Sequence, residues 1–224
     1  TWLIWRDLGE TAARREGGFA AQLREYPELL TSPRFWGYTA TAMFTSGAFF
    51  AYLGGAPFVG SEIFHLDPAT LGFLFGSAAL GYLFGNWASG RLATRFGINR
   101  LIVWGAIITS LGLAASLALH LAGLGGPYVF FGFMVPLGFG NGLVMPNAMA
   151  GSLSVRPQLA GSASGLSGTM MIGGGAALYA YAGTLLRTES GAVPLIVLML
   201  VSSGLSLVAI LLVIRRTARV GAGQ

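Results

Sequence analysis

Polar and helix-weakening residues are concentrated in one segment, residues 138–166, of a chain that is otherwise strongly apolar. This segment carries Asn141, Asn147 and Pro146 together with a run of serines and many glycines. At membrane depth such groups must pack against other helices or line a water-filled path, because hydrocarbon leaves unpaired polar groups unsatisfied. The chemistry that they offer is hydrogen bonding, either to a neighbouring helix or to a ligand.

The same segment and the residues after it contain one arrangement that resembles a nucleophile. Gly165, Ser167 and Gly168 match the Gly-x-Ser-Gly of rhomboid proteases, which also have six spans. A serine nucleophile needs a base within hydrogen-bond reach. The two histidines, His65 and His120, precede Ser167 and are expected near the membrane surface. We therefore expect no catalytic residues, and an intramembrane serine protease is a remote alternative.

The composition is typical of a multi-span membrane protein. The chain has 224 residues, of which 54% are hydrophobic and 9% are charged, whereas soluble domains carry roughly 25% charged residues. It has no cysteine, which excludes disulfides and thiolate metal sites, and we expect no metal and no cofactor. The net charge of +5 comes from arginines in short connections between apolar runs, so we expect no nucleic-acid partner.

Six apolar runs are each long enough to cross a bilayer, which needs about 20 residues. The predicted fold class is an all-α, polytopic bundle of six transmembrane helices, and consecutive helices run antiparallel because the connections are short. The transmembrane domain covers residues 34–216, with spans near residues 34–59, 69–91, 98–122, 126–151, 159–186 and 191–214.

The arginines predict the orientation in the membrane. Twelve of the thirteen precede the first span, follow the second, fourth or sixth span, and so share one side, whereas Arg187 lies on the other side. By the positive-inside rule, both ends of the chain are cytoplasmic. We expect a multi-pass protein of the bacterial inner (cytoplasmic) membrane.

Three segments lie outside the six predicted spans. Residues 1–6 are apolar but too short to span, so we interpret them as the end of a preceding transmembrane helix. Residues 7–33 form a polar cytoplasmic linker in which large apolar residues recur at helical spacing, as in an amphipathic surface helix. Residues 217–224 are interpreted as a cytoplasmic tail.

Small residues and prolines predict where helices touch and bend. Gly81 and Gly85 belong to a strip of small residues that lets another helix approach closely, and Gly161 and Gly165 repeat the pattern in the fifth span. A proline inside a helix removes a backbone hydrogen bond and kinks the helix, and Pro57, Pro136 and Pro146 fall within or near span ends. Two of them in the fourth span predict the most bent helix, with Asn147 pairing to backbone groups that the kink frees.

The predicted loop between the second and third spans carries a spaced set of glycines and arginines, Gly90, Arg91, Thr94, Arg95, Gly97 and Arg100. This set resembles the cytoplasmic loop signature of the major facilitator superfamily, with Thr94 where the family has an acidic residue. Without that acid, Arg95 and Arg100 remain to cap helix C-terminal carbonyls or to bind anionic headgroups. The alternative is that they are simply positive-inside charges.

Further motifs follow in order and narrow the resemblance. Residues 8–11 are similar to the end of the sixth helix of many drug-efflux transporters, and residues 57–59, 146–150 and 160–166 follow at matching spacing. Together they resemble the bicyclomycin-resistance family of drug:proton antiporters. The resemblance implies that the chain is the C-terminal six-helix half of a twelve-helix transporter, whose first half is its partner.

The resemblance implies multidrug efflux by proton-coupled antiport and alternating access, with the proton gradient as the coupling force. It places a lipophilic drug in a central cavity lined by the first, second, fourth and fifth spans. Apolar, thioether and amide groups suit such a site, and the candidates are Met43, Phe44, Ser46, Phe50, Phe139, Asn141, Met145, Met170 and Met171. The alternatives are interhelical hydrogen bonding for Asn141 and lipid-facing or packing roles for the aromatic and methionine side chains.

None of the six spans has an acidic residue near its centre, so we expect the proton-coupling carboxylate in the other half. Glu62 and Asp67 are expected at helix ends and in a loop on the outer side. Two other functions are weighed against drug efflux. One is a major facilitator transporter of a metabolite or sugar, and the other is a stand-alone six-helix channel or structural subunit.

Overall fold

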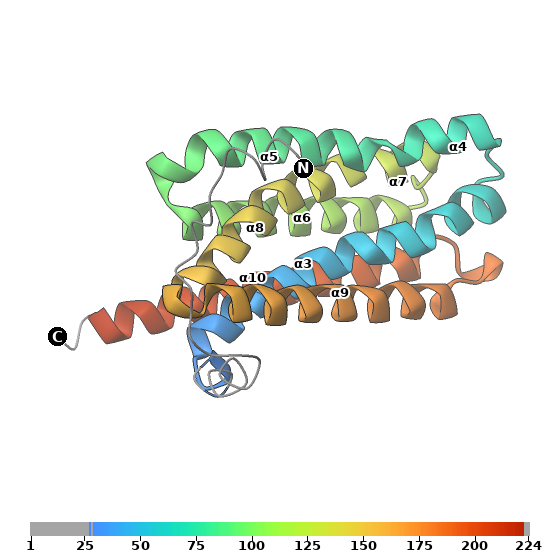
Figure 1. Cartoon of the computed structure of the whole chain (residues 1–224). Helices are drawn as coiled ribbons and strands as arrows, with labels where there is room; N and C mark the ends of the chain where they lie inside the picture. The colour runs from blue at the N-terminus through green and yellow to red at the C-terminus, as the bar shows by residue number, and fades with distance from the viewer. Residues whose placement is uncertain (1–26, 28, 222–224) are drawn as a thin grey trace, which may run out of the picture.

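The computed structural model describes residue 27 and residues 29–221, and all regular elements in this part of the chain are helical. The predicted all-α class is confirmed, with six membrane-length segments that lie side by side (Figure 1). The elements are α3 (Pro33–Phe58) with the π-helical η1 (Val59–Ile63), α4 (Pro68–Phe75), α5 (Ser77–Phe96), α6 (Ile98–Leu121), α7 (Pro127–Gly132), α8 (Met134–Ser154), the turn η2 (Pro157–Leu159), α9 (Ala160–Leu185), the turn η3 (Thr188–Ser190) and α10 (Val193–Gly221).

Five segments of the described chain are long and apolar enough to cross a membrane. They are α3 with η1, α4–α5, α6, α7–α8 and α10. The sixth, α9, has 26 residues and is equally long. Its seven glycines and three serines lower its hydropathy. Among the six long segments, α9 is therefore the one least suited to a surrounding of lipid alone.

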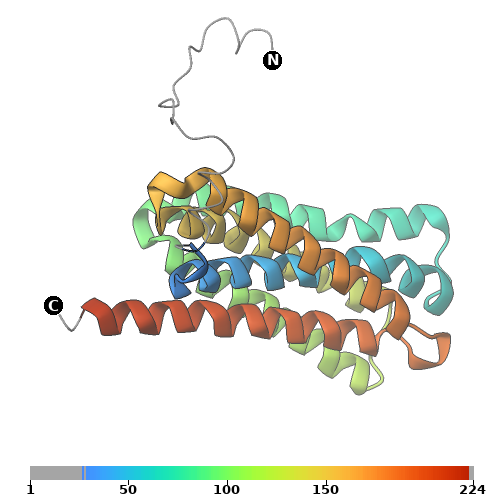
Figure 2. The same cartoon turned by 60° about the horizontal axis from the view of Figure 1, so that its bottom comes forward.

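Two helices, α3 and α8, form the centre of the bundle. Helix α3 packs against α8, α9 and α10, and helix α8 packs against α3, α5 and α6. Helices α6 and α10 contact each other and cover one side of the central pair, whereas α5 packs mainly on α8 and α9 mainly on α3. Consequently α5 and α9 lie at opposite edges of the bundle (Figure 1), and a second view shows α9 crossing in front of it (Figure 2).

These contacts repeat within the chain. The first three spans are α3, α4–α5 and α6, and the last three are α7–α8, α9 and α10. The contacts of α3 with α9 and α10 correspond to those of α8 with α5 and α6. Because two spans, α4–α5 and α6, lie between α3 and α7–α8, the first and fourth spans are antiparallel and the two triplets run in opposite directions. The bundle is thus an inverted repeat of three helices.

The contact between α5 and α8 is made by glycines on both helices. A Cβ atom added to Gly81 would collide with the carbonyl oxygen of Val135, and one added to Gly85 would collide with that of Phe139. Gly138 and Gly142 on α8 approach the backbone of α5 in the same way. The two backbones therefore touch directly, as small residues allow in membranes.

Gly161 and Gly165 do not form the close contact that their spacing predicts. A Cβ atom at either position would have no described atom within 4 Å. The side of α9 that faces α3 carries Ser167, Gly174 and Gly175 instead. Within the described bundle no helix packs on Gly161 or Gly165, because both lie on a face of α9 that the described helices leave open, and a close contact at this face stays a prediction.

The fourth span is broken rather than bent at its first proline. Helix α7 ends at Gly132 and α8 begins at Met134, so Pro136 lies in the first turn of α8, where its missing N–H costs little. Pro146 is inside α8, and Pro57 is inside α3 just before the π-helical turn. The prediction of two kinks within one continuous helix is therefore corrected for Pro136.

Asn147 has a different partner from the predicted one. Its Nδ2 donates to the Leu143 carbonyl oxygen at 2.7 Å and to Ser89 Oγ at 2.7 Å. Pro146 frees the carbonyl of Gly142, one residue earlier, because a helical N–H pairs with the carbonyl four residues before it. Asn147 therefore bonds the next carbonyl along α8 and also connects α8 to α5.

The set of glycines and arginines predicted to form a loop lies almost entirely on helices. Residues 90–96, including Gly90, Arg91, Thr94 and Arg95, belong to the end of α5, and only Gly97 separates α5 from α6. Gly97 has φ +80°, a conformation that favours glycine.

Arg95 and Arg100 therefore lie at helix ends of opposite polarity. Arg95 is in the last turn of α5, where a cation is favourable. Arg100 is in the first turn of α6, where its own helix offers no C-terminal carbonyls, so its expected contact with such carbonyls would have to be made to another helix and stays a prediction.

The last helix extends beyond the predicted sixth span. Helix α10 continues to Gly221, so residues 217–221 extend the last helix instead of forming a tail. The interpretations of residues 1–6 and of the amphipathic helix in residues 7–33 lie outside the described residues, except for residues 27 and 29–33.

Charged residues separate along the bundle axis. One end carries the exposed arginines of the described chain, Arg34, Arg91, Arg95, Arg100, Arg156, Arg215 and Arg216. The other end carries Arg187 together with the described carboxylates, Glu62, Asp67 and Glu189. We refer to these as the arginine end and the acidic end.

The glycine contact yields a prediction with a control in the same helix. Gly85→Ala should separate α5 from α8 and lower stability by about 1–3 kcal/mol, the usual range for overpacking. Gly90→Ala adds the same methyl group where no described atom lies within 4 Å, so it should leave stability unchanged or raise it. Thermal unfolding of the detergent-solubilised full-length protein measures both. Equal melting temperatures for the two variants would contradict the contact.

Candidate functional site

Helices α3 and α9 pack against each other, and this contact, the α3–α9 seam, brings together several residues that the sequence predicts for a binding site. Met43 on α3 lies over Gly174, whose added Cβ would come within 2.5 Å of Met43 Cγ. About two turns further along α3, Phe50 lies over Gly175, whose added Cβ would come within 2.5 Å of Phe50 Cδ2. The large side chains of α3 therefore occupy the space that the glycines of α9 leave open.

Polar groups connect the two helices of this seam. Ser46 is 5% exposed, and its Oγ lies 3.0 Å from the Met43 carbonyl and 3.4 Å from that of Met171. Thr39 Oγ1 and Ser167 Oγ lie 2.9 Å apart and share a hydrogen bond. Each polar group thus has a partner, which the hydrocarbon interior requires.

Ser167 belongs to the sequence that resembles a protease motif, and its surroundings do not form a catalytic dyad. Its hydroxyl pairs with Thr39. His65 is exposed at the acidic end, and His120 Nδ1 lies 2.8 Å from the Ser116 carbonyl. No histidine therefore accompanies the serine.

The remaining candidates on α3 and α9 lie close to this seam. Phe44, Met170 and Met171 are each partly buried. The Phe44 carbonyl accepts a hydrogen bond of 2.7 Å from Ser202 Oγ on α10. We call the set Met43, Phe44, Ser46, Phe50, Met170 and Met171 the α3–α9 group.

The three candidates on α8 do not join this group. Phe139 packs in a cluster with Ala88, Leu101 and Leu143, where α5, α6 and α8 meet. That cluster contains no residue of α3 or α9. Phe139 thus lies apart from the candidates on α3 within this bundle, and its place in a central cavity stays a prediction.

Met145 and Asn141 are held inside the bundle. Met145 packs against the buried cluster that includes Tyr38, Ala42 and Ile102. Asn141 is 3% exposed, and its Nδ2 lies 3.4 Å from the Leu137 carbonyl, one turn earlier in α8. This hydrogen bond of Asn141 lies within its own helix, and its side chain does not reach the open surface of this bundle.

Hydroxyl contacts to α10 are structural features that sequence reasoning missed. Thr45 Oγ1 and Ser206 Oγ lie 2.6 Å apart, and Ser206 Oγ also donates to the Thr41 carbonyl at 3.2 Å. Ser203 pairs with Ser110 on α6 at 2.8 Å. The available signal was the spacing of Ser202, Ser203 and Ser206, which puts hydroxyls on one side of an otherwise apolar helix.

Toward the acidic end, two broken spans contact each other at their breaks. Ser77, the first residue of α5, donates from Oγ to the Phe131 carbonyl of α7 at 2.7 Å. Tyr52 on α3 donates to the Phe75 carbonyl, the last of α4, at 2.7 Å, and its ring stacks on that of Phe75 at 5.0 Å. Side-chain hydroxyls therefore bind carbonyls that the breaks leave without helical partners.

The described acidic residues occupy helix ends and loops. Asp67 is the N-cap of α4, where it accepts hydrogen bonds of 3.1 Å from the N–H groups of Ala69 and Thr70. Hydrogen bonding to Thr70 is the main cause that lowers the pKa of Asp67. Glu62 is exposed and pairs with Ser61 Oγ at 3.2 Å. The described residues contain no group of three histidine, aspartate or glutamate side chains that could hold a metal ion.

Comparisons with known proteins agree with this architecture. The family model described as Major Facilitator Superfamily matches residues 1–180. No curated protein matches the chain. A crystal structure of a bacterial homologue of the iron transporter ferroportin, in the outward-facing state, has a TM-score of 0.64 and 19% identity and covers 94% of this chain and 51% of that chain. The same homologue with soaked iron gives 0.62 and 19%, covering 83% of this chain and 47% of that one.

At this identity the likeness to the two structures shows the fold alone, and the chain spans about half of their length. The inverted three-helix repeat is the unit that is nested within each six-helix half of such transporters. Membrane-length helices, this internal repeat and the family match across most of the chain lead to one conclusion. The chain belongs to the major facilitator superfamily and is a multi-pass membrane protein.

Proposed function

We propose that this chain is the C-terminal half of a twelve-helix transporter that exports lipophilic drugs in exchange for protons across the bacterial cytoplasmic membrane. Both of its ends lie in the cytoplasm in this proposal, because the arginine end then faces inward. Membership of the superfamily supports transport rather than catalysis. The observation that carries the proposed substrate class is the chemistry of the α3–α9 group.

The α3–α9 group offers side chains that can repack around different shapes. Met43 and Phe50 rest on glycines of α9, so their side-chain ends and not the helix backbones form the contact. Methionine has three rotatable bonds and a polarisable sulfur, which suits variable apolar ligands. The equivalent seam between α8 and α5 has backbone against backbone and leaves no such freedom.

The open face of α9 supports a position beside the other half. Gly161 and Gly165 have no described neighbour, and Ser164 and Thr169 are exposed nearby. Small and hydroxyl side chains permit close approach of another helix or contact with water, whereas they gain little from lipid. In our proposal this face borders the central cavity and the missing half, and the α3–α9 group lies directly behind it.

The breaks near the acidic end support alternating access. Helices α4 and α7 are short, and each is joined to its longer partner at a single residue, Gly76 or Phe133. The Ser77–Phe131 and Tyr52–Phe75 hydrogen bonds are few and can be exchanged when the segments tilt. We propose that α4 and α7 close the outer side of the cavity in one state and open it in another.

Proton coupling is assigned to the other half in this proposal. Asp67 has a lowered pKa and serves as a helix cap, which suits a permanently charged group rather than a proton carrier. Glu62, in the last turn of the first span, and Glu189, in the turn η3, also lie at the acidic end and not near the middle of a described span. A carboxylate near the membrane centre is therefore expected outside this chain.

Drug export is tested by expression of the full-length transporter in cells that lack their main efflux pumps. Accumulation of a fluorescent lipophilic drug should fall, and an uncoupler should restore it because the proton gradient is lost. Transport of radiolabelled iron is measured in parallel, since iron is named for the homologue whose structures share the fold. Unchanged accumulation across a broad drug panel, or iron transport alone, would contradict the proposed substrate class.

The role of the α3–α9 group is tested with a substitution on α9 that displaces the side chain of Met43 and leaves residue 43 a methionine. Gly174→Ala places a methyl group against the flexible end of Met43, which should shift while the helices stay in place. We expect the export of bulky and small drugs to change relative to each other by roughly tenfold, a typical effect of one methylene in a pocket. Dose–response curves for drugs of graded size measure it, with membrane abundance recorded for each variant.

Gly173→Ala is the matched control, because the same methyl group meets no described atom within 4 Å. It should keep the wild-type drug profile. The double variant Gly174→Ala/Met43→Ala relieves the collision and should restore export of bulky drugs. An identical profile for Gly174→Ala, Gly173→Ala and the wild type would show that Met43 does not shape the binding site.

A further inference from the structure

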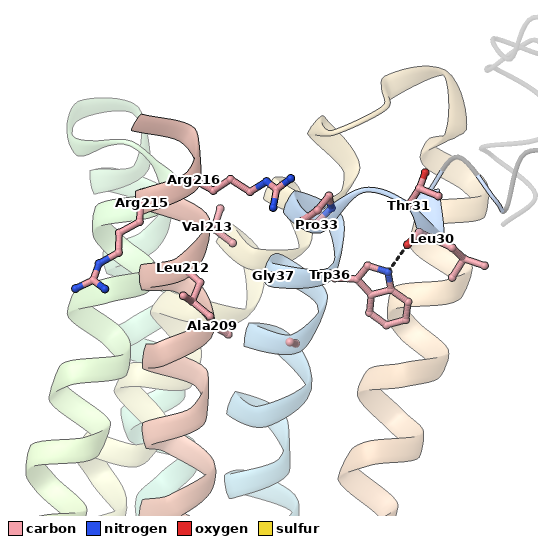
Figure 3. Close-up of a pocket in the computed structure, with 11 residues that line it drawn as sticks. Leu30, Thr31, Pro33, Trp36, Gly37, Ala209, Leu212, Val213, Arg215 and Arg216 are labelled. Carbon is pink, nitrogen blue, oxygen red and sulfur yellow. Dashed lines mark hydrogen bonds between the residues drawn. The ribbon is translucent and has the colours of Figure 1, made fainter. Parts of the chain in front are cut away.

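A groove lies between the start of α3 and the end of α10, at the arginine end of the bundle and apart from the α3–α9 group. Its volume is about 670 Å³. Trp36, Gly37 and Ala40 of α3 line one wall, and Ala209, Leu212 and Arg216 of α10 line the other (Figure 3).

The shape of the groove follows from small residues on both helices. A Cβ atom at Gly37 would collide with Val213 Cγ2, so α3 and α10 touch there and close the floor. Ala40 and Ala209 continue the groove as a narrow apolar channel along the two helices, toward the membrane interior. Leu212 is 59% exposed beside it. A channel of this kind fits a linear hydrocarbon chain.

Trp36 marks the rim of the groove. Its indole Nε1 donates to the Leu30 carbonyl at 2.7 Å, which fixes the ring beside the channel (Figure 3). Tryptophan is enriched at the level of lipid headgroups, where one side of the ring is apolar and its N–H finds a polar partner. The mouth of the groove therefore lies at the membrane surface and its channel within the hydrocarbon.

The charge that the described residues place at the mouth is positive. Arg215 and Arg216 are both exposed, and Arg216 extends toward Pro33 across the end of the groove (Figure 3). Within the described chain, neither guanidinium has a hydrogen-bonding or ion-pair partner. The described carboxylates, Glu62, Asp67 and Glu189, all lie at the opposite end. Guanidinium groups match phosphate in both charge and geometry.

We propose that this groove binds one anionic phospholipid. Its phosphate lies against Arg216, which reaches over the mouth of the groove, whereas Arg215 points to the other side of α10 and adds to the positive charge nearby (Figure 3). Its ester region lies beside Trp36, and one acyl chain follows Ala40 and Ala209. Basic pockets between transmembrane helices bind anionic headgroups in this way. Because the lipid contacts both the first and the last helix of the bundle, it holds α3 against α10 beyond the point where Gly37 and Val213 touch.

The proposal is tested on the full-length protein in nanodiscs of phosphatidylcholine that contain a minor fraction of brominated lipid. The chain has five tryptophans, so the quenching of Trp36 is the difference between the wild type and Trp36→Phe. Brominated phosphatidylglycerol should quench Trp36 more strongly than brominated phosphatidylcholine at equal fraction. Each arginine near an anionic surface contributes about fivefold to lipid preference, so the double variant Arg215→Gln/Arg216→Gln should lower the preference by up to roughly 25-fold.

Two further variants separate a site from a general surface effect. Arg91→Gln/Arg95→Gln removes the same charge from the arginine end at another helix and should leave Trp36 quenching unchanged. Ala209→Phe fills the channel and should abolish the preference while both arginines remain. Equal quenching by the two lipids in the wild type, an equal loss in both double-arginine variants, or no quenching by either lipid would overturn the proposal.

Discussion

The rest of the structure depends on glycines at a few contacts between helices, because a side chain there would collide with the neighbouring helix. Lipid gives helices no hydrophobic reason to associate, so association depends on how closely they pack and on hydrogen bonds between them. In the α5–α8 seam, glycines on both helices bring the backbones into contact. In the α3–α9 seam, which corresponds to it in the inverted repeat, glycines on α9 receive Met43 and Phe50 of α3. One seam is therefore fixed by its backbones, and the other can change through its side chains.

The fold could be predicted largely from the sequence because hydrocarbon permits few backbone structures. Apolar runs of sufficient length had to be helices that satisfy their own hydrogen bonds. The breaks at Gly76 and Phe133 could not be found in this way, because the residues on both sides are equally apolar. The end of α5 was missed for the opposite reason. Residues 90–96 are polar enough for a loop, yet a helix continues into water without difficulty once it has formed.

The candidate site was predictable only where helical spacing fixes the direction of a side chain. Met43 and Phe50 are seven residues apart, close to two full turns, so they share one side of α3. Phe139 and Met145 are six residues apart, which is about 240° of rotation, and they point to different neighbours of α8. Asn141 looked suited to a ligand because it is polar, but polarity does not reveal which side of a helix faces the bundle interior. Its burial followed from the packing of α8 among three helices.

The central claim is that the α3–α9 seam adapts to substrate while the α5–α8 seam stays fixed. The chain lacks cysteine, so spin labels can be attached to introduced pairs at exposed positions of the full-length transporter. One pair, at Arg34 and Gln158, spans the first seam at the start of α3 and of α9, and another, at Gly90 and Ala150, spans the second. Added drug should shift the distance distribution of the first pair and leave the second unchanged. A shift in the α5–α8 pair with none in the α3–α9 pair would contradict this account.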